Sequence, residues 1–142
     1  MINEKIQQIA KILAKYGKTI SGSAEEKEIA VFQKWVQDIY GNINLNEYID
    51  LVKMVNGLDF NGLVVYSVKK DSDENIYSAN DIWHENEDLK NYLFYADADI
   101  TWYCFDTKNR MFCELDKPSG ELMQTFSSFN EMLEAALDSV LA

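Results

Sequence analysis

The segment from Tyr48 to Tyr66 constrains the fold of this chain more than any other part of its sequence. Its first half has apolar residues at i, i+3, i+4 and i+7, which predicts one buried face of a short helix. Asn56-Gly57 follows at once, and glycine closes a helix C-terminus without the steric cost of a Cβ atom. Asn61-Gly62 then predicts a turn into a buried strand over residues 63–68, which are rich in β-branched side chains. The predicted helical face consists of Tyr48, Leu51, Val52 and Val55.

Helical patterns lie at both ends of the chain. A first helix is expected to end at Gly17, and residues 17–23 are expected to form a flexible connector. Ser23 and Glu26 have the spacing of a capping box and predict the start of a second helix. A pattern of the same kind at Ser128 predicts the start of the last helix. The expected buried stripe of the second helix consists of Ile29, Phe32, Trp35, Val36 and Ile39.

Strand patterns occupy the middle of the chain. Residues 80–89 interrupt them and form either a short helix or an ordered loop. Helices at both ends of a run of strands indicate an α+β fold with a central, mostly antiparallel sheet flanked by N-terminal helices and a C-terminal helix. We expect a single domain spanning residues 1–142. After residue 68, strands are predicted at 76–77, 92–96, 100–106, 111–116 and 122–126.

The pairing of two of these strands can be predicted residue by residue. If they form a hairpin across residues 107–110, Cys104 faces Cys113. One face is then apolar and is assigned to the core: Ile100, Trp102, Cys104, Met111, Cys113 and Leu115. The other face mixes aromatic and acidic side chains: Thr101, Tyr103, Phe105, Phe112, Glu114 and Asp116. Such a face suits contact with another protein; alternatively, a flanking helix or loop covers Phe105 and Phe112.

Composition narrows the functional class. Hydrophobic residues make up 47% of the chain, which argues against disorder. No segment has the length and apolarity of a membrane span, and the first residues do not form a secretory leader, so we expect a cytoplasmic protein. The formal net charge of −11 disfavours nucleic-acid binding and favours encounter with a basic protein. The alternative is that this charge serves solubility alone.

Several patterns point toward catalytic or metal chemistry but are incomplete. Gly17-Lys18-Thr19 lacks the first glycine of a phosphate-binding loop, and residues 71–75 lack the glycine of a calcium loop. The cysteines and the single histidine lack zinc spacing, so Cys104 and Cys113 are expected to be reduced core residues that form a disulfide only under oxidation. We therefore expect no enzyme, no cofactor and no metal.

Three residues keep an alternative reading open. His84 lies among carboxylates that would support acid–base work, and Asp97 with Asp99 would bind a metal or share a proton. The simpler interpretation is that His84 is structural or exposed and that Asp97 and Asp99 belong to a polar turn.

Five segments resemble the SUKH superfamily, and within it the YrhA-like small bacterial proteins. They are distributed over most of the chain, from residue 24 to residue 133, and consist mainly of helix caps, turns and core aromatic residues. Their positions are Ala24–Glu26, Leu45–Tyr48, Val55–Gly62, Tyr92–Asp97 and Thr125–Leu133.

This resemblance implies an α+β domain whose bacterial members are commonly immunity proteins of toxin systems. Such proteins bind and block a cognate toxin, often a nuclease, and the family brings no catalytic residues. One position departs from the family pattern, because Asn46 stands where a proline is usual; asparagine also caps helices well.

We therefore expect a cytoplasmic immunity protein that occludes a basic toxin, with no nucleic-acid or membrane partner. The alternative is a protein-interaction or small-ligand scaffold without a toxin partner. The sequence leaves the oligomeric state open. The candidate partner-binding residues are Asp81, Trp83, His84, Glu85, Glu87, Asp88, Asp97, Asp99, Tyr103, Phe105, Phe112, Glu114 and Asp116.

Overall fold

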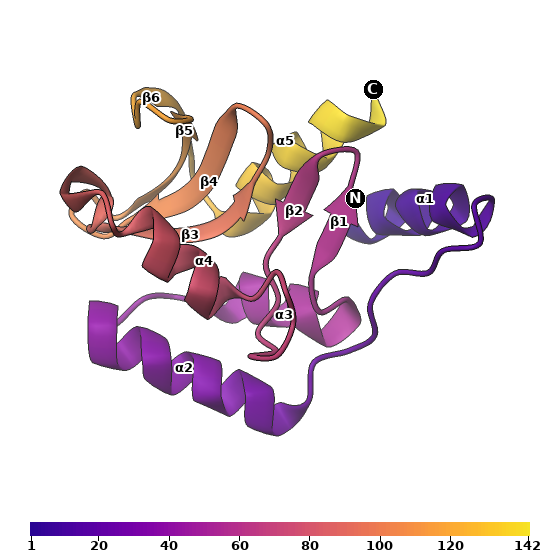
Figure 1. Cartoon of the computed structure of the whole chain (residues 1–142), viewed down its shortest axis with the longest axis horizontal. Coiled ribbons are helices and arrows are strands. Elements are labelled where there is room, and N and C mark those ends of the chain that lie inside the picture. Colours follow the sequence, from indigo (N-terminus) through magenta and orange to yellow (C-terminus); the bar gives the residue numbers. More distant parts are fainter.

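The computed structural model of residues 1–142 contains a six-stranded antiparallel sheet whose strands follow one another in chain order (Figure 1). The strands are β1 (Leu58–Phe60), β2 (Leu63–Val65), β3 (Tyr92–Asp97), β4 (Thr101–Asp106), β5 (Met111–Asp116) and β6 (Leu122–Phe126). The helices are α1 (Ile2–Ala14), α2 (Glu26–Tyr40), α3 (Asn46–Met54), α4 (Ile76–Trp83), the short 3-10 helix η1 (Glu87–Leu89) and α5 (Phe129–Leu141). The predicted α+β fold with terminal helices around an antiparallel sheet is therefore correct. No helix combines the length and the apolar character needed to cross a membrane.

Adjacent residues of β3 show how helices cover both faces of the sheet. The Tyr95 ring lies 5.1 Å from that of Phe129 on α5 and 4.9 Å from that of Tyr48 on α3. Phe94 points to the other face, where Trp83 of α4 packs against Trp102 of β4 at 5.2 Å. In Figure 1, α4 lies over the front of the sheet and α5 behind it. The sheet is thus the middle layer of the molecule.

The segment from Tyr48 to Tyr66 folds largely as predicted. All four residues of its predicted apolar face are buried; three of them belong to α3, whereas Val55 follows the helix in an extended conformation, and Gly57 has a φ of +94°. Asn61 and Gly62 also have positive φ, as the two central residues of a type I′ hairpin turn require. The prediction missed the strand that precedes this turn, β1, and it made β2 too long. The chain leaves β2 after Val65, and Val68 N–H donates to the Asn56 side chain instead of to a strand (2.9 Å).

The predicted start and inner face of α2 are wrong in detail. The capping box is formed by Glu25 and Glu28, whose carboxylate accepts from Glu25 N–H at 2.9 Å. Ser23 remains in the connector because Ala24 N–H donates to Val52 C=O (2.8 Å), which holds the chain extended at this point. Ile39 is exposed, since it falls outside the face that packs on α3 and α4.

The strand predicted at Ile76-Tyr77 is instead the first turn of α4. Asn75 caps this helix by accepting a hydrogen bond from Ser78 N–H (2.8 Å). Its amide also donates to the carbonyls of Lys70 and Ser72, so a single buried side chain starts the helix and shapes the preceding loop. Of the two alternatives for residues 80–89, the structure contains the helical one, followed by η1.

The β4–β5 hairpin has the predicted register, in which Cys104 pairs with Cys113. The two thiols are reduced and buried, and their sulfur atoms are 3.5 Å apart. The apolar face is buried in its middle, whereas Ile100 and Met111 at its ends are exposed.

The opposite face of this hairpin is covered rather than free. Phe129 of α5 packs over Phe112, and Tyr103 and Phe105 are each only 5% exposed. The structure therefore has the alternative in which a flanking helix covers the aromatic residues.

Asn80 attaches α4 to the sheet where β2 ends. Its side chain accepts a hydrogen bond from Phe94 N–H (2.8 Å) and donates to Phe94 C=O (2.9 Å), as a neighbouring strand would. It also donates to Ile76 C=O within its own helix (2.8 Å). Since Asn80 is completely buried, these bonds satisfy backbone groups that water cannot reach.

Candidate functional site

The acidic residues predicted between 81 and 88 share one exposed end of the molecule, at the close of α4 and along η1. Asp81, Glu85, Glu87 and Asp88 are all exposed. Lys90 is the cation that pairs within this segment, at 2.8 Å from the Glu87 carboxylate. We call these four carboxylates the acidic end.

Trp83 and His84 belong to the same segment but point inward. The Trp83 indole N–H donates to the Tyr66 hydroxyl (3.0 Å), and His84 Nε2 lies 2.7 Å from Tyr92 C=O. That carbonyl can only accept, so His84 Nε2 carries a hydrogen. Both rings are half-buried and hold α4 against the sheet.

The structure does not bring His84 together with Asp97 and Asp99. His84 is bonded at Tyr92, the first residue of β3, and Asp97 is the last residue of that strand. These strand ends are roughly 16 Å apart at about 3.3 Å per residue. Asp97 points toward Tyr66, whereas Asp99 is exposed beside Gly62.

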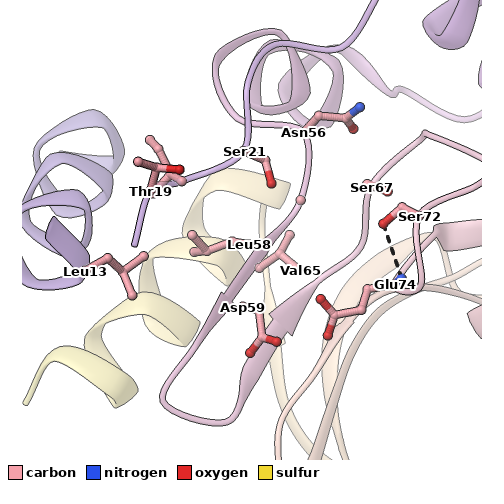
Figure 2. Close-up of a pocket in the computed structure, with 12 residues that line it drawn as sticks. Leu13, Thr19, Ser21, Asn56, Leu58, Asp59, Val65, Ser67, Ser72 and Glu74 are labelled. Atoms are coloured by element: carbon pink, nitrogen blue, oxygen red, sulfur yellow. Dashed lines mark hydrogen bonds between the residues drawn. The ribbon is translucent and has the colours of Figure 1, made fainter. Parts of the chain in front are cut away.

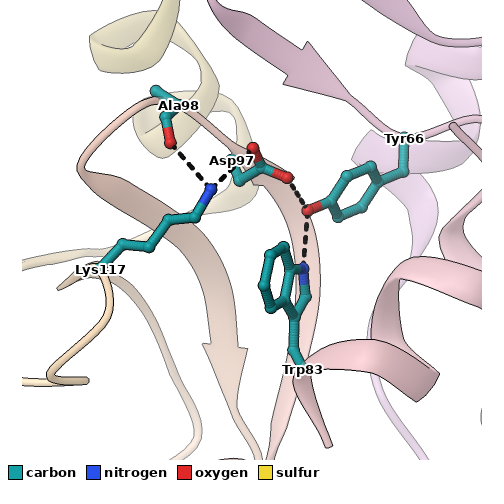
Figure 3. A network of polar contacts seen from close by, with 5 residues as sticks. All are labelled: Tyr66, Trp83, Asp97, Ala98 and Lys117. Carbon is teal, nitrogen blue, oxygen red and sulfur yellow. Dashed lines mark hydrogen bonds and ion pairs between the residues drawn. The ribbon is translucent and has the colours of Figure 1, made fainter.

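Asp97 is the centre of a half-buried polar network (Figure 3). The Tyr66 hydroxyl donates to one carboxylate oxygen, and Lys117 lies 3.3 Å from the other. The Lys117 ammonium also donates to Ala98 C=O (3.2 Å) and lies 5.0 Å from the centre of the Trp83 ring. Burial and the neighbouring Asp97 raise the pKa of Tyr66 well above its ordinary value, so the phenol stays protonated and keeps donating. The arrangement ties the end of β3 to α4 and to the β5–β6 turn.

The remaining candidates lie on the hairpin face that α5 covers. Tyr103 and Phe105 are in the core, and Phe112 is half-buried beneath Phe129. Glu114 and Asp116 are half-buried, and burial raises the pKa of Glu114. The aromatic residues predicted for partner contact are therefore packing residues, because α5 occupies the place proposed for a partner.

A polar pocket that the sequence did not indicate lies between the connector and the loop preceding α4 (Figure 2). We call it the connector pocket. It has a volume of about 140 Å³ and is lined by residues of three segments: Leu13 with residues 19–21, residues 56–59, and Val65, Ser67, Ser72 and Glu74. A second, wholly polar hollow adjoins it along the same loop. Sequence reasoning missed the pocket because its walls come from three separate segments, none of which contains a recognised motif.

Two carboxyl groups face each other in this pocket. Figure 2 shows the side chains of Asp59 on β1 and Glu74 directed toward one another. Partial burial, together with the negative charges of Asp59, Asp97 and Asp73, raises the pKa of Glu74 to about 7. Glu74 therefore keeps its proton to higher pH than an ordinary glutamic acid does, and this proton relieves the repulsion between the two carboxyl groups.

Ser67 completes the floor of the pocket with an unusual hydroxyl group. The residue is 3% exposed, and its Oγ has no hydrogen-bond partner. Its backbone is fully engaged, since Ser67 N–H donates to Glu74 C=O (3.1 Å) and Ser67 C=O accepts from Ile76 N–H (2.8 Å). Buried polar atoms normally have partners, which makes this hydroxyl a marked exception.

Comparison with known proteins gives no relative from which to transfer a function: no family model and no curated protein matches the chain.

Proposed function

We propose that this chain is an immunity protein of the SUKH type, which binds a basic toxin in the cytoplasm and blocks it by occlusion. The observation that carries the proposal is the acidic end, where four carboxylates from two consecutive elements are exposed together on a chain of net charge −11. The resemblance of five sequence segments to that superfamily supplies the toxin as the expected partner.

The acidic end offers apolar as well as charged contact. Ile82 lies among the carboxylates on α4 and is 55% exposed. Exposed charges mainly accelerate encounter with a partner of opposite charge, while buried apolar contacts contribute most of the affinity. Ile82 would therefore contribute to the affinity for the partner, and the surrounding carboxylates would increase the rate of association.

Reversing charges at the acidic end tests whether this surface contacts the toxin. The variant Glu85→Lys, Glu87→Lys and Asp88→Lys should slow association with the toxin domain by about tenfold or more at low salt and weaken its salt dependence. The matched control reverses Glu4, Asp50 and Glu121, which are exposed on α1, on α3 and in the β5–β6 turn. Stopped-flow or surface-plasmon measurements over a range of NaCl concentrations give both rates. Equal rates for the two variants would remove the acidic end from the proposal.

The toxin itself is tested through the neighbouring reading frame. The C-terminal domain of a large protein encoded beside this chain should be captured by it and should stop cell growth when expressed alone. Co-expression of the chain should restore growth. Capture without growth rescue would favour an interaction protein with a different role.

A second function, a scaffold for a small ligand, is favoured by one specific feature. The connector pocket combines a partly open, mainly polar volume with a buried hydroxyl group that has no partner in the protein. Saturable binding of a small molecule there, in a chain that captures no toxin domain, would favour this second function.

A further inference from the structure

We propose that the connector pocket binds a monovalent organic cation through a primary ammonium or guanidinium group. This site is distinct from the acidic end, and the inference does not depend on the identity of a toxin.

The charge of the pocket selects for a cation. Asp59 and Glu74 are its only charged lining residues, and both are carboxyl groups. Lys18 and Lys69 line the neighbouring hollows but are not among the residues that line this pocket. An anion would meet two acids and no base here, whereas a cation would be attracted by both carboxyl groups.

The hydroxyl of Ser67 selects for a cation that carries hydrogen-bond donors. Ser67 Oγ has an unused acceptor position, and a bound N–H group would supply the partner that this buried atom lacks. Gly57 packs directly against this residue, because a Cβ at position 57 would lie 3.0 Å from the Ser67 Cβ. Ammonium and guanidinium groups donate in several directions at once, which matches acceptors on β1, the floor and the loop.

The size of the pocket limits the ligand to a small head group on a short stem. One water molecule occupies about 10–15 Å³ of such a cavity, so about 140 Å³ accommodates several atoms beyond a single solvent molecule. A bare metal ion fits the site poorly, since no group of three or more Asp, Glu, His or Cys side chains converges anywhere in the structure.

The first experiment uses the full chain alone. Methylammonium and methylguanidinium chlorides are titrated into isotopically labelled protein at constant ionic strength, and backbone amide shifts are recorded by NMR. We expect saturable shifts at Gly57, Ser67 and Glu74. Sodium and tetramethylammonium chlorides serve as controls, because neither cation carries N–H donors. Shifts that do not saturate, or that the controls reproduce, would mean a general salt effect and overturn the proposal.

Two variants connect the binding to the named side chains. Glu74→Gln should weaken binding by about tenfold or more, and Ser67→Ala by roughly threefold. Ser67→Ala removes a hydroxyl without a partner, so the variant should fold and be at least as stable as the parent. Asp50→Asn makes the same charge change as Glu74→Gln on the exposed side of α3 and should bind normally. Unchanged binding by Glu74→Gln or Ser67→Ala would contradict the site.

The pH dependence gives an independent readout. Binding should strengthen as pH rises through the pKa of Glu74, because the cation then no longer competes with a proton. Asp59, Asp73 and Asp97 raise that pKa together, so the change is expected between about pH 6 and 8. Glu74→Gln should remove most of this dependence. The same pH profile in parent and variant would overturn the assignment.

The source of the cation is distinguished by comparing a free ligand with a peptide. Methylguanidinium is compared with a blocked Gly-Ser-Arg-Ser-Gly peptide, whose arginine carries the same head group. A peptide that binds about tenfold more tightly identifies the side chain of a partner, since its backbone would extend into the adjoining polar hollow. Equal or tighter binding of methylguanidinium identifies a free small cation. No binding by either one, while a toxin is still neutralised, would overturn this inference and leave the proposed function intact.

Discussion

At the scale of single residues, Glu74 couples the connector pocket to the stability of the fold. Its carboxyl group has an ordinary pKa of 4.5, which partial burial and neighbouring acids raise to about 7 in the folded protein. The folded chain therefore holds a proton more tightly than the unfolded chain does. The resulting stabilisation is fully present below pH 4.5 and is lost as the pH rises through 7.

Replacing this carboxyl group should flatten part of the pH dependence of stability. Between pH 5 and 8 we expect the melting temperature of Glu74→Gln to fall less than that of the parent, leaving the variant about 2 °C higher at pH 8. Differential scanning calorimetry at several pH values measures the effect. Asp50→Asn should keep the parental pH dependence. If Glu74→Gln keeps it as well, the carboxyl pair does not contribute to stability.

Residues such as Glu74 and Ser67 were beyond sequence reasoning for a physical reason. The raised pKa of Glu74 depends on Asp59, and the burial of Ser67 depends on Gly57. Both neighbours are distant in sequence and come close only in the folded chain. Ser128, in contrast, was predicted as a helix cap, and it accepts from Glu131 N–H (3.1 Å) because both partners lie within one turn of chain.

At the scale of elements, α4 depends on Asn80 for its attachment to β3. Replacement of Asn80 by alanine leaves both the N–H and the C=O of Phe94 without partners in the core, and replacement by aspartate leaves the C=O without one. We expect Asn80→Ala to lower the free energy of unfolding by about 3 kcal/mol, and Asn80→Asp, which cannot donate, by a comparable amount. Urea unfolding measures both. Asn86→Ala removes an exposed cap of η1 and should cost about 1 kcal/mol or less. Equal losses for Asn80→Ala and Asn86→Ala would contradict this role.

The elements differed in how far the sequence could predict them. The β4–β5 hairpin was predicted to the residue, because alternation and a short loop fix its register locally. β1 was missed because it has only three residues and turns Asp59 outward. Ile76-Tyr77 has strand-forming side chains, but the buried cap at Asn75 makes these residues helical. In these short elements, tertiary contacts thus determine the secondary structure more than the local sequence preference does.

At the scale of the whole molecule, self-repulsion of the acidic surface opposes folding. The net charge of −11 is partly screened by salt, and compact states gain more from this screening than unfolded ones. Raising NaCl from about 0.02 to 0.3 M at pH 7.5 should increase the melting temperature by about 3 °C. The gain should disappear near the isoelectric pH of about 4.4. A decrease at pH 7.5 would show that the surface ion pairs contribute more than the repulsion.

The packing of α1 against α5 determines the order in which the molecule can be completed. The strands pair with their neighbours in chain order, so most of the sheet can assemble while the chain is being made. α1 is different: Lys5 pairs with Asp138 (2.7 Å) on α5, the last helix, and Ile6 and Ile9 are buried. During synthesis on the ribosome, the apolar face of α1 therefore remains uncovered until α5 has emerged. This long loop closes only after α5 has been made, and until then Ile6 and Ile9 form an apolar surface that a chaperone would recognise.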